Sequence, residues 1–163
     1  MPNWCHNLLE VSGLEVEEFV KRVKGLPQIY KTENIEEFIE EILSFHQIVP
    51  IPPDILASHY DSVAENTELF LWGCKWGATE TSFSKIQEVV IYKFFTPWNP
   101  PKKFLLQASK LFLCKFTLKY AEFAISFAGE YICQYGKEIK DLNWRVDQSD
   151  RELFKLEHSL LNN

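Results

Sequence analysis

The sequence contains little of what marks the most easily recognised classes of protein. Only 6 of its 163 residues are glycine and 8 are proline, which excludes a collagen-like or low-complexity chain. No apolar run approaches the roughly 18 residues that a membrane span needs, and the first 20 residues lack the pattern of a secretory signal. We therefore expect a cytoplasmic protein that does not contact a membrane.

The usual motifs of catalysis and cofactor binding are also missing. The chain has no GxxxxGK[ST], GxGxxG, HExxH, GxSxG or EF-hand pattern, and its four histidines are scattered. Cys5 and His6 are neighbours, but a strand would point them to opposite faces, which does not suit a nucleophile and its base. We predict no catalytic residues, no metal site and no cofactor, and thus a protein that is not an enzyme.

The four cysteines are too few for a disulfide scaffold and too far apart for a Cys-x-x-Cys zinc site. Free cysteine usually behaves as a small hydrophobic residue, so we predict buried, inert thiols at Cys5, Cys74, Cys114 and Cys133. Cys74 differs in having a lysine beside it, Lys75, and a neighbouring cation lowers the pKa of a thiol.

Aromatic residues are abundant, and charge is unevenly distributed. The chain is 15% aromatic and 46% apolar, which is enough for one folded domain with a substantial core. Residues 1–70 carry 4 basic against 13 acidic residues, whereas residues 71–135 carry 8 against 4. The net charge of −6 argues against binding duplex DNA, but the lysine-rich middle suits a smaller anionic partner.

Apolar periodicity and capping patterns predict the order of the elements. The expected strands are 3–12, 43–49, 88–96, 115–122 and 125–135. A capping box at 12–15 predicts a helix that ends at about residue 24. Further helices are expected at 34–41, at 62–72 and at 99–112, the last with Asn99 as its cap. A capping box at 149–152 predicts a terminal helix.

This order predicts an α+β, ferredoxin-like split βαβ sandwich, with an antiparallel sheet, an aromatic insert and an appended C-terminal helix. We expect a single domain over 1–163, with its core at 1–136 and a C-terminal extension at 137–163. The terminal helix carries an apolar stripe of Leu153, Leu156 and Leu160, which must be buried, so we predict that it contributes to a homodimer.

Five blocks of sequence resemble a known family. They are MPNWCHN at the start, LSFHQIVPIPPDI at 43–55, LFLWGCKWG at 69–77, FFTPWNPP at 94–101, and the stretch from Tyr120 to Gly129. In this order they are similar to the YubB-type ferredoxin-like domain family of phage and plasmid proteins, over roughly residues 1–136. The resemblance implies the ferredoxin-like fold and an origin on a mobile element. It implies no activity, because the function of that family is unknown.

A candidate ligand site lies in two segments bounded by glycine and proline. Trp and Lys side chains there provide rings that stack on a base and ammonium groups that meet phosphate, and a helix start at Asn99 would present free backbone amides to an anion. The candidate residues are Trp72, Lys75, Trp76, Trp98, Asn99, Lys102 and Lys103. The alternative is that the tryptophans plug the ends of the sandwich.

A second candidate surface is the sheet face that the helices leave uncovered. We expect Trp4, His6, Tyr92 and Phe94 to lie there, where aromatic side chains stack bases in RNA-recognition modules of the same topology.

The favoured function is that of a non-enzymatic protein, encoded by a phage or plasmid, that acts on a host process. Its most concrete form is sequestration of a small anionic nucleotide, such as a host defence signal, as an anti-defence protein in the host cytoplasm. The alternative is a protein inhibitor that uses the acidic first 70 residues to mimic nucleic acid and block a host nucleic-acid-binding protein.

Overall fold

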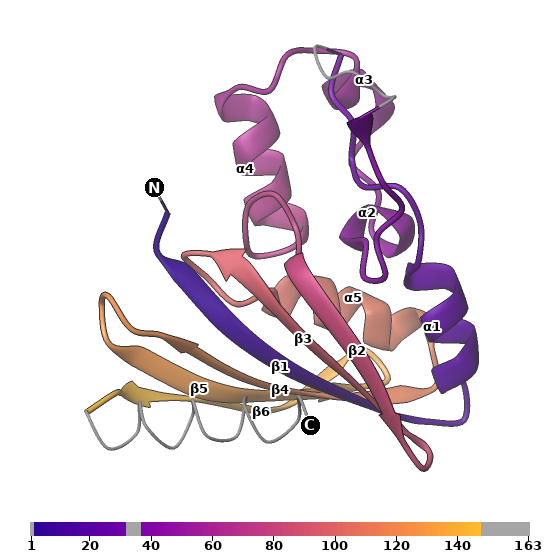
Figure 1. Cartoon of the computed structure of the whole chain (residues 1–163), viewed down its shortest axis with the longest axis vertical. Coiled ribbons are helices and arrows are strands. Elements are labelled where there is room, and N and C mark those ends of the chain that lie inside the picture. Colours follow the sequence, from indigo (N-terminus) through magenta and orange to yellow (C-terminus); the bar gives the residue numbers. More distant parts are fainter. Residues whose placement is uncertain (1, 32–36, 148–163) are drawn as a thin grey trace.

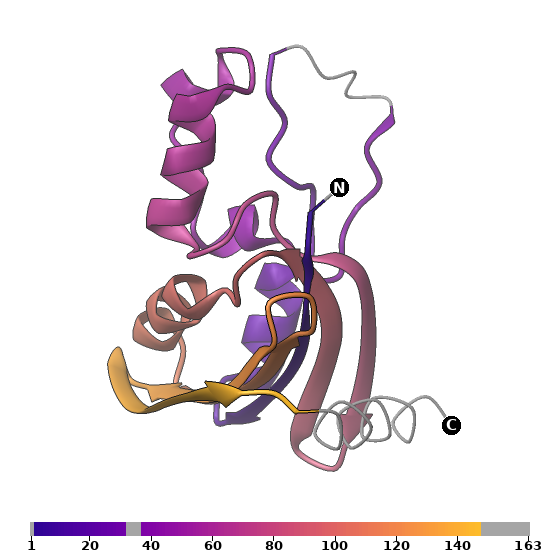
Figure 2. The same ribbon diagram turned by 90° about the vertical axis from the view of Figure 1, so that its left-hand side faces the viewer.

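The computed structural model describes residues 2–31 and 37–147. The described part contains a six-stranded antiparallel sheet with two helices packed on one face and a helical insertion at one end (Figures 1 and 2). Its elements are β1 (Trp4–Gly13), α1 (Val16–Val23), α2 (Phe45–Ile48), α3 (Pro53–Leu56), α4 (Ser62–Leu71), β2 (Thr79–Ile86), β3 (Val89–Pro97), α5 (Lys102–Leu111), β4 (Cys114–Glu122), β5 (Phe127–Gln134) and β6 (Lys137–Arg145). The predicted terminal helix, and with it the predicted dimer contact, lies outside the described residues.

The strand order is β2-β3-β1-β4-β5-β6, and every neighbouring pair is antiparallel. Along the chain, β1, α1, β2, β3, α5 and β4 form the βαββαβ unit of a ferredoxin-like fold, with β1 in its interior. The hairpin of β5 and β6 extends this sheet past β4. The predicted α+β, ferredoxin-like fold is therefore confirmed.

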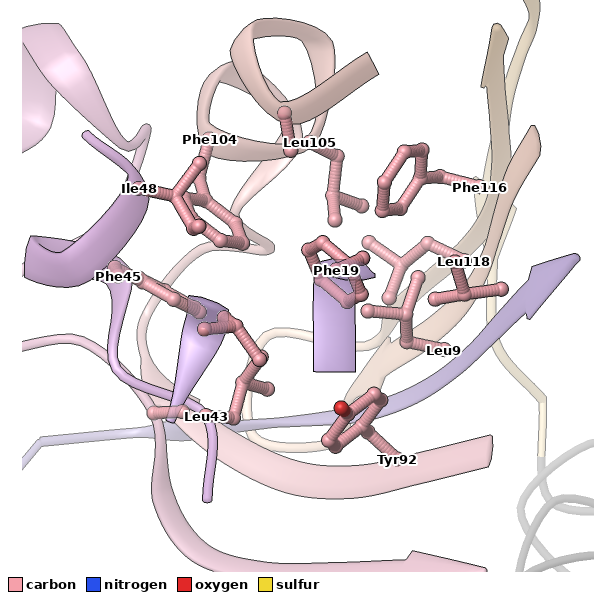
Figure 3. Close-up of a cluster of buried hydrophobic side chains, with 14 of the residues drawn as sticks. Leu9, Phe19, Leu43, Phe45, Ile48, Tyr92, Phe104, Leu105, Phe116 and Leu118 are labelled. Atoms are coloured by element: carbon pink, nitrogen blue, oxygen red, sulfur yellow. The ribbon is translucent and has the colours of Figure 1, made fainter. Parts of the chain in front are cut away.

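The core lies between the sheet and the two helices α1 and α5. On β1, Cys5, Leu9 and Val11 are fully buried on the helix side, as the alternation along this strand predicts. Phe19 of α1 points into the same space (Figure 3), and its ring centroid lies 5.1 Å from that of Phe116 on β4. This aromatic packing fixes how α1 sits on the sheet.

The insertion between α1 and β2 packs on the start of α5. Phe45 of α2 stacks on Phe104 of α5 with 4.1 Å between the ring centroids (Figure 3). Trp72, directly after α4, is fully buried and donates its Nε1 hydrogen to the carbonyl oxygen of Val49 at 2.8 Å. The insertion thus shares the hydrophobic core of the sheet.

Two predicted elements in the insertion are wrong. The predicted strand at 43–49 contains the short helix α2, in which Phe45 and Ile48 lie one turn apart and are both buried. A buried helical turn and a buried strand give similar short apolar runs, so periodicity did not separate them. The predicted helix at 34–41 is absent from its described part, where residues 38–40 have no regular structure and Glu41 forms an isolated bridge with Gly25.

The predicted helix caps are also corrected. Ser12 lies within β1, and the carboxylate of Glu15 accepts a hydrogen bond from the backbone of Leu113 at 2.6 Å, so no capping box forms. The cap of α4 is Asp61, whose carboxylate accepts from two backbone amides, and not Ser62, with which the predicted helix begins. The cap position of α5 is Pro101 and not Asn99.

The helix-free face of the sheet carries different aromatic residues from those predicted. Tyr92 and Phe94 point to the opposite face and are buried in the core beneath the helices. Phe95 takes their place, with its ring 4.6 Å from that of His6 and 6.5 Å from that of Trp4. Trp4 and His6 contact Phe95 on the helix-free face, which agrees with their predicted position. On β3 the prediction chose the wrong set of alternating residues, because a shift of one residue along a strand moves every side chain to the opposite face.

No helix in the described ranges is long and apolar enough to cross a lipid bilayer.

Candidate functional site

The structure divides the seven predicted site residues among three places. Trp72 belongs to the core, where it has no exposed surface and contacts Phe45 edge to face at 5.7 Å. Its ring is therefore unavailable to a ligand, and its inclusion in the site was wrong. The competing interpretation, a tryptophan that plugs one end of the sandwich, holds for this residue.

The second group is an aromatic pair with a lysine on top of it. Trp76 and Trp98 lie edge to face with 5.7 Å between ring centroids, and the Lys75 ammonium lies 4.7 Å from the centroid of Trp98. Lys75 also forms an ion pair with Glu65 of α4. Because both its charge and its position over the ring are already engaged, Lys75 contributes to structure more than to an open anion site.

Both tryptophans of this pair have left-handed backbone conformations, with φ of 63° at Trp76 and 60° at Trp98. Such values are uncommon for bulky residues and are held here by hydrogen bonds. The Trp76 amide donates to Glu68 at 2.9 Å, and the Trp98 amide donates to the carbonyl oxygen of Asn3 at 2.8 Å.

The third group lines a cavity of about 390 Å³ beside the start of α5, which we call the lysine pocket. Asn99, Lys102 and Lys103 of the predicted site are among its lining residues. The remaining lining residues were not predicted: Gly73, Pro100, Tyr120, Phe127 and Asn143. The Phe127 ring is partly exposed at the pocket, whereas the Tyr120 ring, 6.1 Å away between centroids, is only 2% exposed and belongs to the core.

The two lysines of this pocket have different environments. The Lys102 ammonium donates to a carboxylate oxygen of Asp141 at 2.5 Å and lies 4.9 Å from the centroid of the Tyr120 ring. Burial lowers the pKa of Lys102, but the bonds to Asp141 and Tyr120 outweigh it, and the net pKa is raised, so this lysine is charged. Lys103 is exposed, and its ammonium meets the Leu69 carbonyl oxygen at 3.3 Å.

The backbone at the start of α5 offers less to an anion than the sequence suggested. The amide of Lys102 donates to Pro100 at 3.0 Å, and the amide of Phe104 donates to Trp72 at 3.1 Å. Two of the first amides of the helix are thus already used. Anion binding in the lysine pocket therefore depends chiefly on side chains: the two ammonium groups and the exposed Asn99 amide.

The four thiols are buried, as predicted. Burial is the main cause that raises the pKa of each, to about 11 for Cys114 and Cys133 and well above the ordinary value for Cys74. The neighbouring Lys75 does not activate Cys74, because its ammonium is engaged by Glu65. Within residues 2–31 and 37–147, no group of three or more His, Cys, Asp or Glu side chains is arranged to hold a metal ion.

The strand order, the helices on one face and the βαββαβ connectivity together define a ferredoxin-like domain that carries a helical insertion. The family model described as the ferredoxin-like domain in Api92-like protein matches residues 72–158, and the chain belongs to that family. A search of curated proteins gave no match.

Among solved structures, the chain is similar to the crystal structure of the protein Api92 from Yersinia pseudotuberculosis. The TM-score is 0.57 at 11% sequence identity, over 90% of this chain and 99% of that one. At this identity the similarity establishes a shared fold.

Proposed function

We propose that the protein is a non-enzymatic binding protein whose lysine pocket holds a small anionic ligand of the nucleotide class. One observation carries the proposal: Asn99, Lys102 and Lys103 come together with the partly exposed ring of Phe127 around one cavity, behind which Tyr120 is buried. Its volume of about 390 Å³ lies in the range of small-molecule sites. A ring for a base, here that of Phe127, and ammonium groups for phosphate are what such a ligand needs.

The charges of the pocket support this choice of ligand. Its described lining residues include two lysines and no carboxylate. Asp141 approaches Lys102 and holds its ammonium in place. A bound phosphate would compete with Asp141 for Lys102 and pair directly with Lys103, so we expect Lys103 to carry most of the change in charge on binding.

The biological setting that we propose is the one implied by the sequence resemblance: a phage- or plasmid-encoded protein that sequesters a host defence signal in the host cytoplasm. The alternative, mimicry of nucleic acid by the acidic first 70 residues, has less support. Two of the exposed carboxylates in that region are paired within the chain, Glu17 with Lys85 and Glu40 with Lys24. Pairing reduces the density of free negative charge that mimicry requires.

The test is calorimetry of the intact protein against a panel of linear and cyclic nucleotides. We expect one ligand to bind in a 1:1 ratio, and Lys103→Ala to weaken it about tenfold, as the loss of about 1.4 kcal/mol would. Lys110→Ala is the matched control, because Lys110 is exposed near the other end of α5 and lies outside the lining of the pocket. If the folded protein binds no member of the panel, the proposal fails and nucleic-acid mimicry becomes the hypothesis to test.

A further inference from the structure

The helix-free face of the sheet carries buried apolar side chains that do not belong to the core. Leu8 on β1 and Ile91 on β3 are 4% and 6% exposed, and both lie outside the core cluster beneath α1 and α5. Side chains alternate between the faces of a strand, so Leu8 and Ile91 point away from the helices, because their neighbours Leu9 and Tyr92 point toward them.

The described helices lie on the other face of the sheet or at one end of it (Figures 1 and 2). A face of an antiparallel sheet that is open to water is normally polar and exposed. Here Lys93, which lies opposite Leu8 in the pairing of β1 with β3, is only 7% exposed as well. The burial of apolar and charged side chains together indicates that a further part of the protein covers the middle of this face.

The end of the described chain leads onto the same face. After β6, the backbone amide of Val146 donates to the carbonyl oxygen of Ser126 at 2.9 Å. The Val146 side chain is 7% exposed and packs in a small cluster, separate from the core, with Ala121, Ala128 and Phe123. The Phe123 ring lies 5.0 Å from that of His6, which places this cluster on the helix-free face. The chain therefore leaves β6 over that face.

The residues that follow have the pattern and the length to cover it. For residues 148–163 the sequence predicts a helix with Leu153, Leu156 and Leu160 along one side. A helix of about 14 residues spans about 20 Å, or about four of the 4.8 Å spacings between neighbouring strands. The family match extends past β6 to residue 158, so most of this segment belongs to the domain that the family shares.

We propose that residues 148–163 dock as an amphipathic helix on the helix-free face, with Leu153, Leu156 and Leu160 against Leu8 and Ile91. The docked segment occupies the face on which RNA-recognition modules of the same topology stack bases, so this face is closed to nucleic acid. The lysine pocket plays no part in this contact, and either proposal can fail without the other.

A nitroxide spin label in the intact chain tests where the segment lies. The four native thiols have no exposed surface, so His158→Cys adds one reactive thiol, on the side of the predicted helix opposite the leucines. A nitroxide broadens the NMR signals of groups near it. We expect the backbone amide signals of Leu8 and Ile91 to be lost and that of Val63 in α4 to remain. Ascorbate, which reduces the nitroxide, should restore the lost signals.

A mixed sample identifies whose segment covers the face. Isotope-labelled chain without the nitroxide is mixed with unlabelled chain that carries it. We expect the signals of Leu8 and Ile91 to persist in this mixture. Their loss there would assign the face to a second copy of the chain and overturn the proposal. The proposal is also overturned if both signals persist in the chain that carries the isotope and the nitroxide together.

A pair of substitutions tests whether the leucines make the contact. Leu156→Asp should restore both signals in the nitroxide-labelled chain, because a carboxylate cannot be buried against apolar side chains without a large cost. Asn162→Asp is the matched control, since it adds the same charge on the opposite side of the predicted helix, and it should leave the signals lost. Equal effects of the two substitutions would contradict the proposal. The same spectra show whether each variant is folded, and Leu160→Asp serves should Leu156→Asp fail to fold.

Discussion

The ring of Tyr120 on β4 packs directly over Gly129 on β5. A Cβ atom placed at position 129 would lie 2.1 Å from the Tyr120 hydroxyl oxygen and 2.4 Å from the carbonyl oxygen of Leu142 on β6. Both distances are far below van der Waals contact, so the absence of a side chain at 129 is what lets Tyr120 lie in the wall of the lysine pocket.

Gly129→Ala should therefore destabilise the fold by about 1–3 kcal/mol, the usual cost of overpacking. Urea denaturation measures the effect. In a Tyr120→Ala background the cost of Gly129→Ala should shrink, because one of the two clashes is gone. Fully additive effects of the two substitutions would contradict this account of Gly129.

Trp72→Phe separates a core role from a ligand-binding role. The substitution removes the hydrogen bond from Nε1 to Val49 and leaves that buried carbonyl without its donor, at a cost of about 1–3 kcal/mol. We expect a lower unfolding midpoint and unchanged affinity for any anion that the lysine pocket binds. A loss of affinity larger than that caused by Lys103→Ala would show that Trp72 belongs to the site after all.

Asp61→Ala tests the start of α4. The Asp61 carboxylate accepts from the amides of Val63 at 2.8 Å and Ala64 at 3.1 Å, and losing such a cap costs about 1 kcal/mol. Ser62→Ala is the control, since Ser62 is the first helical residue and not the cap. Chemical denaturation should rank Asp61→Ala well below Ser62→Ala in stability, and the reverse ranking would contradict the structure.

Glu41 makes stability depend on pH in the direction opposite to that of most carboxylates. Burial raises the pKa of Glu41 from its ordinary 4.5 to about 7. Between these values the folded protein binds more protons than the unfolded chain, so this residue makes stability fall as pH rises from about 4.5 to 7. Glu41→Gln should therefore match the parent protein at pH 4 and exceed it in stability at pH 8.

Denaturation curves at both pH values check this prediction, with Glu18→Gln as the control for a simple change of net charge. Equal stabilisation by the two substitutions at pH 8 would assign the effect to overall charge and not to the burial of Glu41.

The elements that the sequence predicts correctly are those with a strong apolar signal. β1, β3, β4 and β5 carry buried side chains on at least one face, and α1 and α5 bury several residues each. The edge strands β2 and β6 were missed. Most of their residues are exposed, so neither shows the alternation of apolar and polar side chains by which a strand is recognised.

Part of the site follows from the sequence for a similar reason. Asn99, Lys102 and Lys103 were predicted together because they are neighbours along the chain, and the fold keeps neighbours together. Tyr120 and Phe127 reach the same pocket only through the pairing of β4 with β5, although both lie in one of the sequence blocks that carry the family resemblance. A further cavity joins Gln28 and Glu41 to Glu68 and Trp76, and no local pattern encodes that contact.

The central position of β1 has a consequence for how the protein folds as it is synthesised. β1 is made before the other five strands of this sheet, yet it pairs with β3 on one side and β4 on the other. Its side-chain bond from Asn7 to Thr96 spans 89 positions of the chain. Contacts so distant in sequence form slowly, because long loops must close before the pairing can stabilise them. β1 must therefore wait, with both edges unpaired, until β3 and β4 have left the ribosome, and a nascent chain arrested before β3 should not contain the sheet.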